Sequence, residues 1–235
     1  MGKIISSIDD VEIWYVTKVD GYWESSRKLT IEGITGSMGS PVFLDNPDEM
    51  YFMNLNDSGT FHIYKVTRTD NIWGNPELVD IPVPPSKVFN WAFSIANNLN
   101  VYFTLSSTFE DENSKIYVSK YNNGAYGEPE ALGFNDDSYG TSSPSIAPDE
   151  SYIVFDTDRP NGYGYHDIYI SYLDEFGHFG TPVNMGNLVN TDEEELLPII
   201  SRDGKFLFFI AKRTTDVFWA VYWISINELS VINID

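Results

Sequence analysis

The chain of 235 residues contains no cysteine. This absence excludes disulfide bonds, zinc–thiolate sites and thiol nucleophiles, but it does not identify the compartment, because many exported proteins also lack cysteine. No run of 18 apolar residues occurs, so we expect no membrane insertion. The opening residues, Met1 to Ser6, lack an apolar stretch of signal-peptide length. We therefore expect either a cytosolic protein or a mature or trimmed form with a new initiating Met.

Basic residues are also scarce. The chain has 14 Lys and Arg against 35 Asp and Glu, and a formal net charge of −21 at pH 7. A field of this sign opposes binding to nucleic-acid phosphates and to anionic membrane surfaces. It favours solubility and the attraction of cations or basic partners, although an acidic surface with no dedicated partner explains the same composition. We expect a monomer that has no nucleic-acid partner.

The chain is rich in aromatic and turn-forming residues, with 15 Tyr, 15 Phe, 6 Trp, 12 Pro and 17 Gly. Such a composition favours half-buried strands joined by many turns. Five pairs of a β-branched residue followed by an aromatic one lie at nearly constant spacing, with aromatic members 50, 53, 52 and 53 residues apart. This fixed period predicts one supersecondary unit repeated in series. The copies are Ile13-Trp14, Ile63-Tyr64, Ile116-Tyr117, Ile168-Tyr169 and Val221-Tyr222.

Each repeat is expected to form up to four short antiparallel strands. The fourth copy shows this best, with segments 143–146, 151–155, 167–172 and 182–185 separated by turn residues. A second aromatic segment precedes each of the last four signature tyrosines by 12 to 14 residues, ending at Phe52, Phe103, Phe155 and Phe209. Pro41, Pro144 and Pro198 are expected at exposed strand starts, where no N–H need be donated.

The repeats predict an all-β fold, a β-propeller of five blades within a single domain covering residues 1–235. The expected bounds are a partial blade at 1–36, with a strand through Ile4 and Ile5, followed by blades at 37–86, 87–139, 140–193 and 194–235. The last blade is expected to end in a strand at 230–234. The alternative is a piece of a six-bladed ring whose remainder lies outside this chain.

Residues 141–213 resemble a known repeat family. Segment 141–149, TSSPSIAPD, resembles the P-S-x-S-P-D-G opening of the WD-like propeller repeat of TolB and its relatives. Segment 156–169 resembles the motif S-x-R-x-G-G-x-G-x-x-D-I-Y, and 187–205 resembles a linker of OmpA-associated lipoprotein propellers. The resemblance implies a non-catalytic propeller that binds protein or cell-envelope partners, in the periplasm or outside the cell. It carries over no functional residues, because the motif shapes turns and packs blades.

Aromatic residues in polar loops are the candidate ligand-binding residues. Tyr and Trp on loops offer stacking surface for glycans or peptides at little entropic cost. The alternative is that these rings pack over their own loops. His62 and His166 occupy matching positions before two signatures, but two histidines are too few for a metal site. The candidates are Tyr163, Tyr165, His166, Tyr139 and Phe134.

Hard oxygen ligands in one loop make calcium the one cofactor candidate. Asp156, Asp158 and Asn161 could bind it, although their spacing misses the EF-hand pattern, and Asp and Asn also favour turns by bonding their own backbone.

Four consecutive acids at 192–195 are expected to form a solvated turn between blades, or to dock a basic partner. The function predicted from these observations is a non-catalytic platform that binds a protein or a cell-envelope glycan through the loops of one face and the channel mouth. The alternative is a hydrolase of glycosidase or lactonase type that uses carboxylates of the central funnel, with or without a divalent cation.

Overall fold

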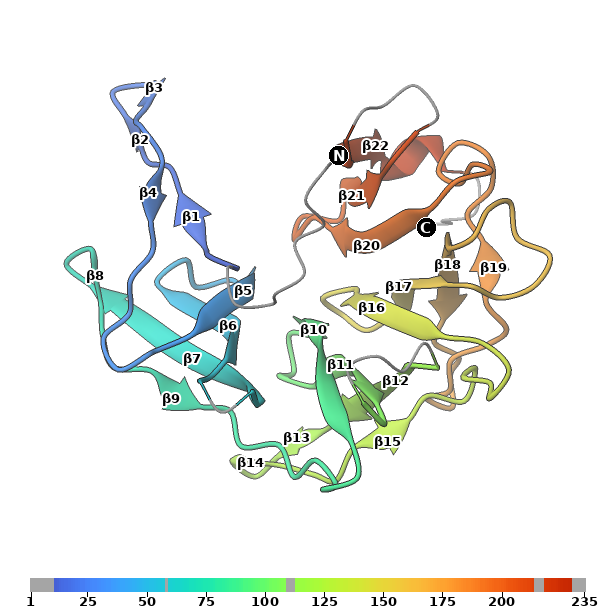
Figure 1. Cartoon of the computed structure of the whole chain (residues 1–235), viewed down its shortest axis with the longest axis horizontal. Helices are drawn as coiled ribbons and strands as arrows, with labels where there is room; N and C mark the ends of the chain where they lie inside the picture. Colours follow the sequence, from blue (N-terminus) through green and yellow to red (C-terminus); the bar gives the residue numbers. More distant parts are fainter. Residues whose placement is uncertain (1–10, 58, 109–112, 214–217, 230–235) are drawn as a thin grey trace. The chain divides into compact units, whose positions relative to one another are not determined.

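The computed structural model describes residues 11–57, 59–108, 113–213 and 218–229 (Figure 1). The strands expected at Ile4–Ile5 and at 230–234 lie outside these ranges. The chain divides into two compact units, one up to Asp80 and one from Ile81 onward. In the described ranges the only helix is the short 3-10 helix η2 (Ile226–Glu228). No described helix has the length and apolar character needed to cross a membrane.

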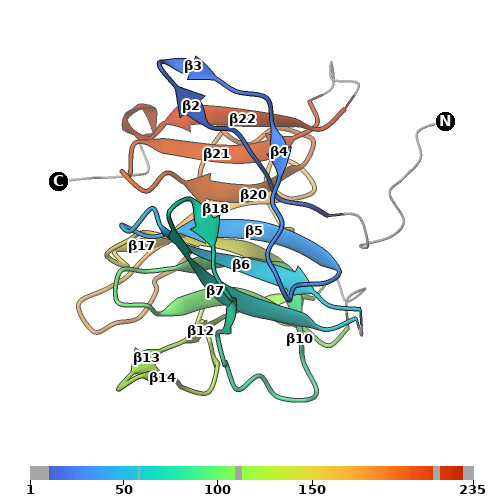
Figure 2. The same ribbon diagram turned by 90° about the vertical axis from the view of Figure 1, so that its left-hand side faces the viewer.

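The first unit contains one antiparallel sheet and a shorter paired segment before it (Figure 2). The segment packs Ile13, Leu29 and Ile31 against Met50 and Phe52 of the sheet. The sheet consists of β5 (Ser37–Phe43), β6 (Glu49–Leu55), β7 (Phe61–Thr69), β8 (Ile72–Trp73) and β9 (Glu77–Leu78). In the preceding segment, β1 (Trp14–Tyr15) pairs with β4 (Arg27–Lys28), and β2 (Lys18–Val19) pairs with β3 (Tyr22–Trp23).

The second unit contains three antiparallel sheets that follow one another in chain order (Figure 1). The first consists of β10 (Val88–Ile95), β11 (Val101–Ser106), β12 (Lys115–Ser119) and β15 (Glu130–Ala131), with a side hairpin of β13 (Tyr121–Asn122) and β14 (Ala125–Tyr126). The next consists of β16 (Thr141–Ile146), β17 (Tyr152–Thr157), β18 (Asp167–Tyr172) and β19 (Val183–Asn184). The last consists of β20 (Glu195–Ile200), β21 (Phe206–Ala211) and β22 (Ala220–Ser225).

The predicted all-β fold and the β-propeller arrangement are confirmed, but the prediction of five blades is wrong. Within the described ranges the chain forms four blade-like sheets, one in the first unit and three in the second. Residues 11–34 carry the first copy of the signature, at Trp14. They form only ladders of two residue pairs each, with no inner strand in the described part. A signature therefore marks a strand and its partner, and not always a complete blade.

In each of the last four copies, the two aromatic anchors face each other across paired strands. Each second-strand Phe is the direct partner of a signature Tyr, as in Phe155 with Tyr169 and Phe209 with Tyr222. The rings of Phe209 and Tyr222 stack with centroids 5.9 Å apart. Such opposed pairs stabilise a sheet beyond their buried area. The pairing therefore fixes which residues face each other across the two strands, while the length of the connecting loop differs between copies.

The sequence led us to expect the three prolines at strand starts, but the structure places them inside strands. Pro41, Pro144 and Pro198 lie inside β5, β16 and β20, at shifts in the pairing register. The residue before each proline has positive φ, namely 49° at Ser40, 54° at Ser143 and 52° at Leu197. A β-bulge leaves one residue outside the ladder, so a residue without an N–H is tolerated there. The prolines therefore mark bulges in the first strand of three blades.

Side chains bonded to the backbone hold the blades of the second unit together. The amide of Asn190 accepts from the Ile168 N–H at 2.8 Å and donates to the Ile168 carbonyl at 2.9 Å. Asn135 makes the same pair of bonds to Ile116 one repeat earlier. Between blades, the Ser145 hydroxyl accepts from the Ile200 N–H at 2.9 Å. These side chains replace ladder bonds where strands end.

One face of the last sheet is more exposed than its counterparts. Val221 is 69% exposed, whereas the equivalent Ile168 of the preceding blade is fully buried at 0%. Ile168 is covered because it belongs to a core cluster shared with Leu207 and Phe209 of the last blade. The core of the second unit is thus built between successive blades, and the last blade contributes only one of its faces to it.

Replacement of Asn190 by Ala should destabilise the chain by about 1–3 kcal/mol, because it leaves the buried N–H of Ile168 without a partner and removes one of the two hydrogen bonds to the Ile168 carbonyl. Urea unfolding followed by tryptophan fluorescence measures this change. Asn122→Ala, at an exposed position of β13, is the matched control and should stay within about 0.5 kcal/mol of the parent. Equal effects of the two substitutions would contradict the role given to Asn190.

Candidate functional site

The loop between β17 and β18 is organised by a buried carboxylate. Asp167 accepts hydrogen bonds from the backbone N–H of Tyr163 at 2.5 Å and from that of Gly164 at 3.0 Å. It also accepts from the Asn184 amide at 2.7 Å. Bonds from N–H groups to an ionised carboxylate are short and strong. The single Asp of the Asp-Ile-Tyr motif thus sets the course of the loop before it.

This loop lies against the segment that leads into β20. The Tyr165 N–H donates to the Glu193 carbonyl at 3.0 Å, and the Glu195 N–H donates to the His166 carbonyl at 2.9 Å. A Cβ on Gly164 would lie 1.8 Å from the Glu193 carbonyl oxygen, a distance that no real contact allows. The two segments therefore approach as closely as their backbones permit, and only glycine fits at position 164.

The acidic run at 192–195 is not wholly solvated, which corrects the expectation of a solvated turn. Glu195 is buried, and its carboxylate accepts from the Thr191 N–H at 2.9 Å and the Thr191 hydroxyl at 2.6 Å. The Arg213 guanidinium lies 3.5 Å from the same carboxylate. Buried charge of this kind is stable only when it is paired and hydrogen-bonded. Glu195 therefore belongs to the architecture, whereas Asp192 is exposed.

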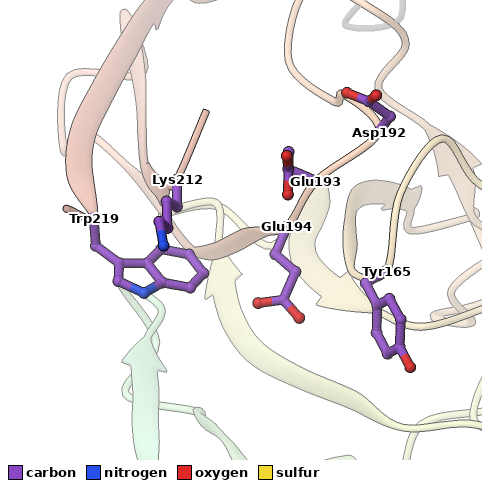
Figure 3. Close-up of a pocket in the computed structure, with 6 residues that line it drawn as sticks. All are labelled: Tyr165, Asp192, Glu193, Glu194, Lys212 and Trp219. Atoms are coloured by element: carbon purple, nitrogen blue, oxygen red, sulfur yellow. The ribbon is translucent and has the colours of Figure 1, made fainter. Parts of the chain in front are cut away.

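A pocket of about 150 Å³ opens where these segments meet the residues that flank the β21–β22 connection (Figure 3). Its two aromatic rings are solvent-accessible, with Tyr165 78% and Trp219 45% exposed. Figure 3 shows the Glu194 side chain extending between Trp219 on one side and Tyr165 on the other. The lining residues are Tyr165, Asp192, Glu193, Glu194, Lys212 and Trp219.

The charge of the pocket lining is unbalanced. Three of the six lining residues carry carboxylates, and Lys212 carries an ammonium group. Aromatic faces attract cations through their quadrupole, and the attraction adds to that of nearby carboxylates. The pocket is therefore suited chemically to a group that is both cationic and able to pack against a ring.

The predicted ligand-binding aromatic residues do not form one site. Two of them lie in the pocket loop, one lies under an arginine, and one lies in the core. Tyr165 lines the pocket, and Tyr163 lies in the same loop with its side chain exposed. The expectation that Phe134 is exposed is wrong, because only 7% of this residue is accessible. Its ring stacks on Phe155 with centroids 4.6 Å apart and meets Phe179 edge-on. Phe134 fills the core between two blades, and only its carbonyl faces the loop.

Tyr139 belongs to a separate arginine cluster. The Arg159 guanidinium lies 5.0 Å from the ring centroid of Tyr139 and 5.6 Å from that of Tyr169. It also donates to the Phe134 carbonyl at 3.2 Å. Close by, the backbone N–H of Ser138 bonds to Asp136 and lowers the pKa of that carboxyl. Tyr139 is thus half-buried under an arginine and not presented beside Tyr165.

The same arrangement recurs in the next blade. The Arg213 guanidinium lies 4.8 Å from the Tyr222 ring centroid and donates to the Val189 carbonyl at 3.0 Å. A stacked guanidinium that also bonds a loop carbonyl combines cation–π attraction with a charge-assisted hydrogen bond. The motif at 156–169 contains Arg159, but the packing role of this arginine was not apparent from sequence.

The candidate calcium ligands have partners within the chain. Asp156 is buried and accepts from the Leu197 N–H at 3.0 Å and from the Ser142 hydroxyl at 2.5 Å. Asp158 accepts from the Gly140 N–H at 2.6 Å, and Asn161 is exposed. In the described ranges no group of three His, Cys, Asp or Glu residues has metal-binding geometry. Calcium stays a prediction from sequence.

His166 is the last residue of the pocket loop, directly before β18. Its Nδ1 is buried 3.9 Å from the Asp156 carboxylate, too far for a hydrogen bond, and has no such partner among the described residues. Its backbone forms an isolated parallel bridge with Glu194. His166 therefore holds the two segments together through its backbone, and a role in ligand contact stays a prediction.

Sequence reasoning missed two residues of the pocket, Lys212 and Trp219. Neither belongs to the repeated signature, and both lie about 50 residues along the chain from Tyr165. The available signal was an adjacent aromatic pair, Phe218 and Trp219, next to a polar stretch.

No protein-family model and no curated protein matches this chain. Among solved structures, it is similar to a TolB-type protein from Agrobacterium tumefaciens, with a TM-score of 0.57, 14% identity, and coverage of 86% of this chain and 66% of that one. For TolB from Acinetobacter baumannii the TM-score is 0.58 with 15% identity, covering 94% and 52%. For a thermostable family-43 glycoside hydrolase the TM-score is 0.56 with 13% identity, covering 86% and 78%.

These similarities support the propeller fold. The chain spans 66% and 52% of the two TolB-type structures, so it corresponds to part of each. Both a TolB protein and a hydrolase occur at nearly equal TM-score, so the fold alone does not separate a binding platform from an enzyme.

Replacement of Gly164 by Ala should destabilise the chain by about 2 kcal/mol and open the pocket, because the Cβ forces the backbone away from Glu193. Chemical denaturation measures the loss of stability. Gly133→Ala is the matched control. Neither glycine has positive φ, and a Cβ at position 133 would meet nothing within 4 Å. A neutral Gly164→Ala variant would show that the two segments do not approach in this way.

Proposed function

We propose that this chain is a non-catalytic propeller platform that binds a protein partner through the pocket face of its second unit. The observation that carries the proposal is the pocket itself, where Tyr165 and Trp219 present accessible rings and the loop of Tyr165 is fixed to Glu193 by a backbone hydrogen bond. Exposed aromatic anchors on a rigid support are typical of recognition surfaces, because little conformational entropy is lost on binding.

The state of the buried acids supports a platform over a hydrolase. Among the described residues of the last two blades, the buried carboxylates are those of Asp156, Asp167 and Glu195. Each one accepts hydrogen bonds from backbone N–H groups of the chain. A glycosidase needs two carboxyl groups that face a substrate, one of them with a raised pKa. Carboxylates that already accept hydrogen bonds from loop backbones are poorly suited to act on a glycoside.

The size of the pocket supports a protein partner over a glycan. Pockets that enclose a small-molecule ligand measure about 300–1,000 Å³. The pocket at Tyr165 and Trp219 measures about 150 Å³. This volume suits one side chain of a protein whose remaining contacts spread over the surrounding face.

The likeness to TolB-type structures supports a TolB-like protein that acts in the periplasm or outside the cell. The net charge of −21 supports a partner that presents basic residues. We propose that the chain is a monomer before it binds.

Peptide display tests the proposal. A random peptide library selected on the full chain should yield peptides that bind the parent at least about tenfold more tightly than the double variant Tyr165→Ala, Trp219→Ala. Phe176→Ala removes another exposed ring, on the turn after β18, and is the matched control. It should leave binding unchanged. Peptides that bind all three proteins equally would count against the pocket face.

A parallel assay tests the enzyme alternative. Aryl glycosides and lactones incubated with the full chain should show no turnover above buffer. Turnover that disappears when Asp156 or Asp167 is replaced by Asn, in a variant that remains folded, would overturn the platform in favour of a hydrolase.

A further inference from the structure

We propose that the pocket receives an arginine side chain of the partner, with the guanidinium packed on the Trp219 indole and paired with the Glu194 carboxylate. This inference rests on the proposed function, since it assigns the side chain by which the partner is recognised. It follows from the lining, the size and the rigidity of the pocket.

The lining combines the two groups that a guanidinium prefers. Its planar, delocalised charge stacks on aromatic faces, and its fork of N–H donors matches the two oxygens of a carboxylate. Trp219 and Tyr165 supply rings, and Glu194 extends between them (Figure 3). A lysine ammonium is compact and more strongly hydrated, so it gains less from the same rings.

The volume of the pocket fits one head group. A pocket of about 150 Å³ has room for a small cluster of water molecules. A guanidinium with the end of its aliphatic stem displaces such a cluster. A guanidinium is also the cation for which the local charge is suited, because the carboxylates of the lining outnumber its ammonium group by three to one.

The chain itself uses this combination inside the second unit. Arg213 lies over the Tyr222 ring, and its guanidinium is 3.5 Å from the Glu195 carboxylate. Arg159 lies over Tyr139 and Tyr169. The pocket offers the same partners, aromatic ring and carboxylate, at the surface. Of its six lining residues, only Lys212 is cationic, so the lining itself supplies no arginine to the pocket.

The backbone that carries Glu194 is held in place before binding. Glu194 lies between Glu193, whose carbonyl accepts from Tyr165, and Glu195, whose N–H donates to His166. Its own backbone forms the bridge to His166. Because the backbone on both sides is fixed, binding need order only the side chain, which costs about 0.5–1.5 kcal/mol.

Nuclear magnetic resonance of the ¹⁵N-labelled full chain tests the inference. The probe is N-acetyl-arginine methylamide, and the reporter is the Trp219 indole N–H resonance, assigned as the one that disappears in Trp219→Phe. The resonance should shift saturably, with a dissociation constant of about 1–10 mM, as expected for a single side chain. The lysine analogue should bind at least about threefold more weakly, and the neutral citrulline analogue should cause no saturable shift.

Substitutions sharpen the test. Glu194→Gln should weaken binding of the arginine probe about tenfold, and Lys212→Gln should strengthen it about threefold by removing repulsion. Glu175→Gln, at an exposed acid outside the pocket, makes the same change of charge and is the matched control that should leave binding unchanged.

The outcomes separate the two proposals. Citrulline binding as tight as arginine binding, or equal effects of Glu194→Gln and Glu175→Gln, would overturn the arginine assignment. Peptides selected by display would then still support the platform. No saturable shift with the arginine probe would likewise overturn the assignment, whereas failure of peptide display would remove the platform and the assignment together.

Discussion

The candidate site depends on one steric constraint, the contact between the loop before β18 and the segment before β20. At Gly164 the two backbones are so close that a single methyl group would collide with the Glu193 carbonyl. Asp167 holds one side of this contact by accepting N–H bonds from the loop, and Glu195 holds the other by binding Thr191. Each carboxylate is buried, and each is compensated by donors of the chain. The pocket opens at the surface where these two segments meet.

Side chains also satisfy backbone groups in the rest of the second unit. Its blades are short sheets whose strands soon leave the ladder, so backbone groups at strand ends need other partners. Asn135 and Asn190 supply them within blades, and Ser94 and Ser145 supply them between blades. The guanidinium groups of Arg159 and Arg213 also stack on two signature tyrosines, Tyr169 and Tyr222. The repeat is therefore a repeat of side-chain-to-backbone bonds as much as of strands, which explains why polar residues recur with the aromatic ones.

The repeated aromatic anchors were sufficient to predict the fold, because each of the last four copies places a Phe opposite a Tyr across paired strands, as in Phe155 with Tyr169 and Phe209 with Tyr222. The blade count was not predictable in this way. Trp14 has the position of a signature aromatic, yet the two-residue ladders around it have no inner strand in the described ranges. A signature aromatic residue therefore indicates the pairing of two strands, but it does not indicate whether further strands join them.

The site was only partly predictable for a similar reason. Tyr165 follows a glycine in a polar loop, and such a local pattern indicates exposure correctly. Phe134 has polar neighbours of the same kind, but its ring reaches into the space between blades, which depends on distant residues such as Phe155. The grouping of Tyr165 with Trp219 joins residues that lie about one repeat apart, and their approach depends on how successive blades pack.

The central claim is that the pocket is supported by two segments fixed to each other before any partner arrives. Hydrogen–deuterium exchange at single residues, measured on the full chain without ligand, tests this most directly. The amides of Tyr165 and Glu195 donate across the contact. Both should exchange at least about a hundredfold more slowly than an unstructured chain, despite their position at the surface. Exchange at unstructured rates would mean that the segments are not joined in the free protein, and the account of the site would be wrong.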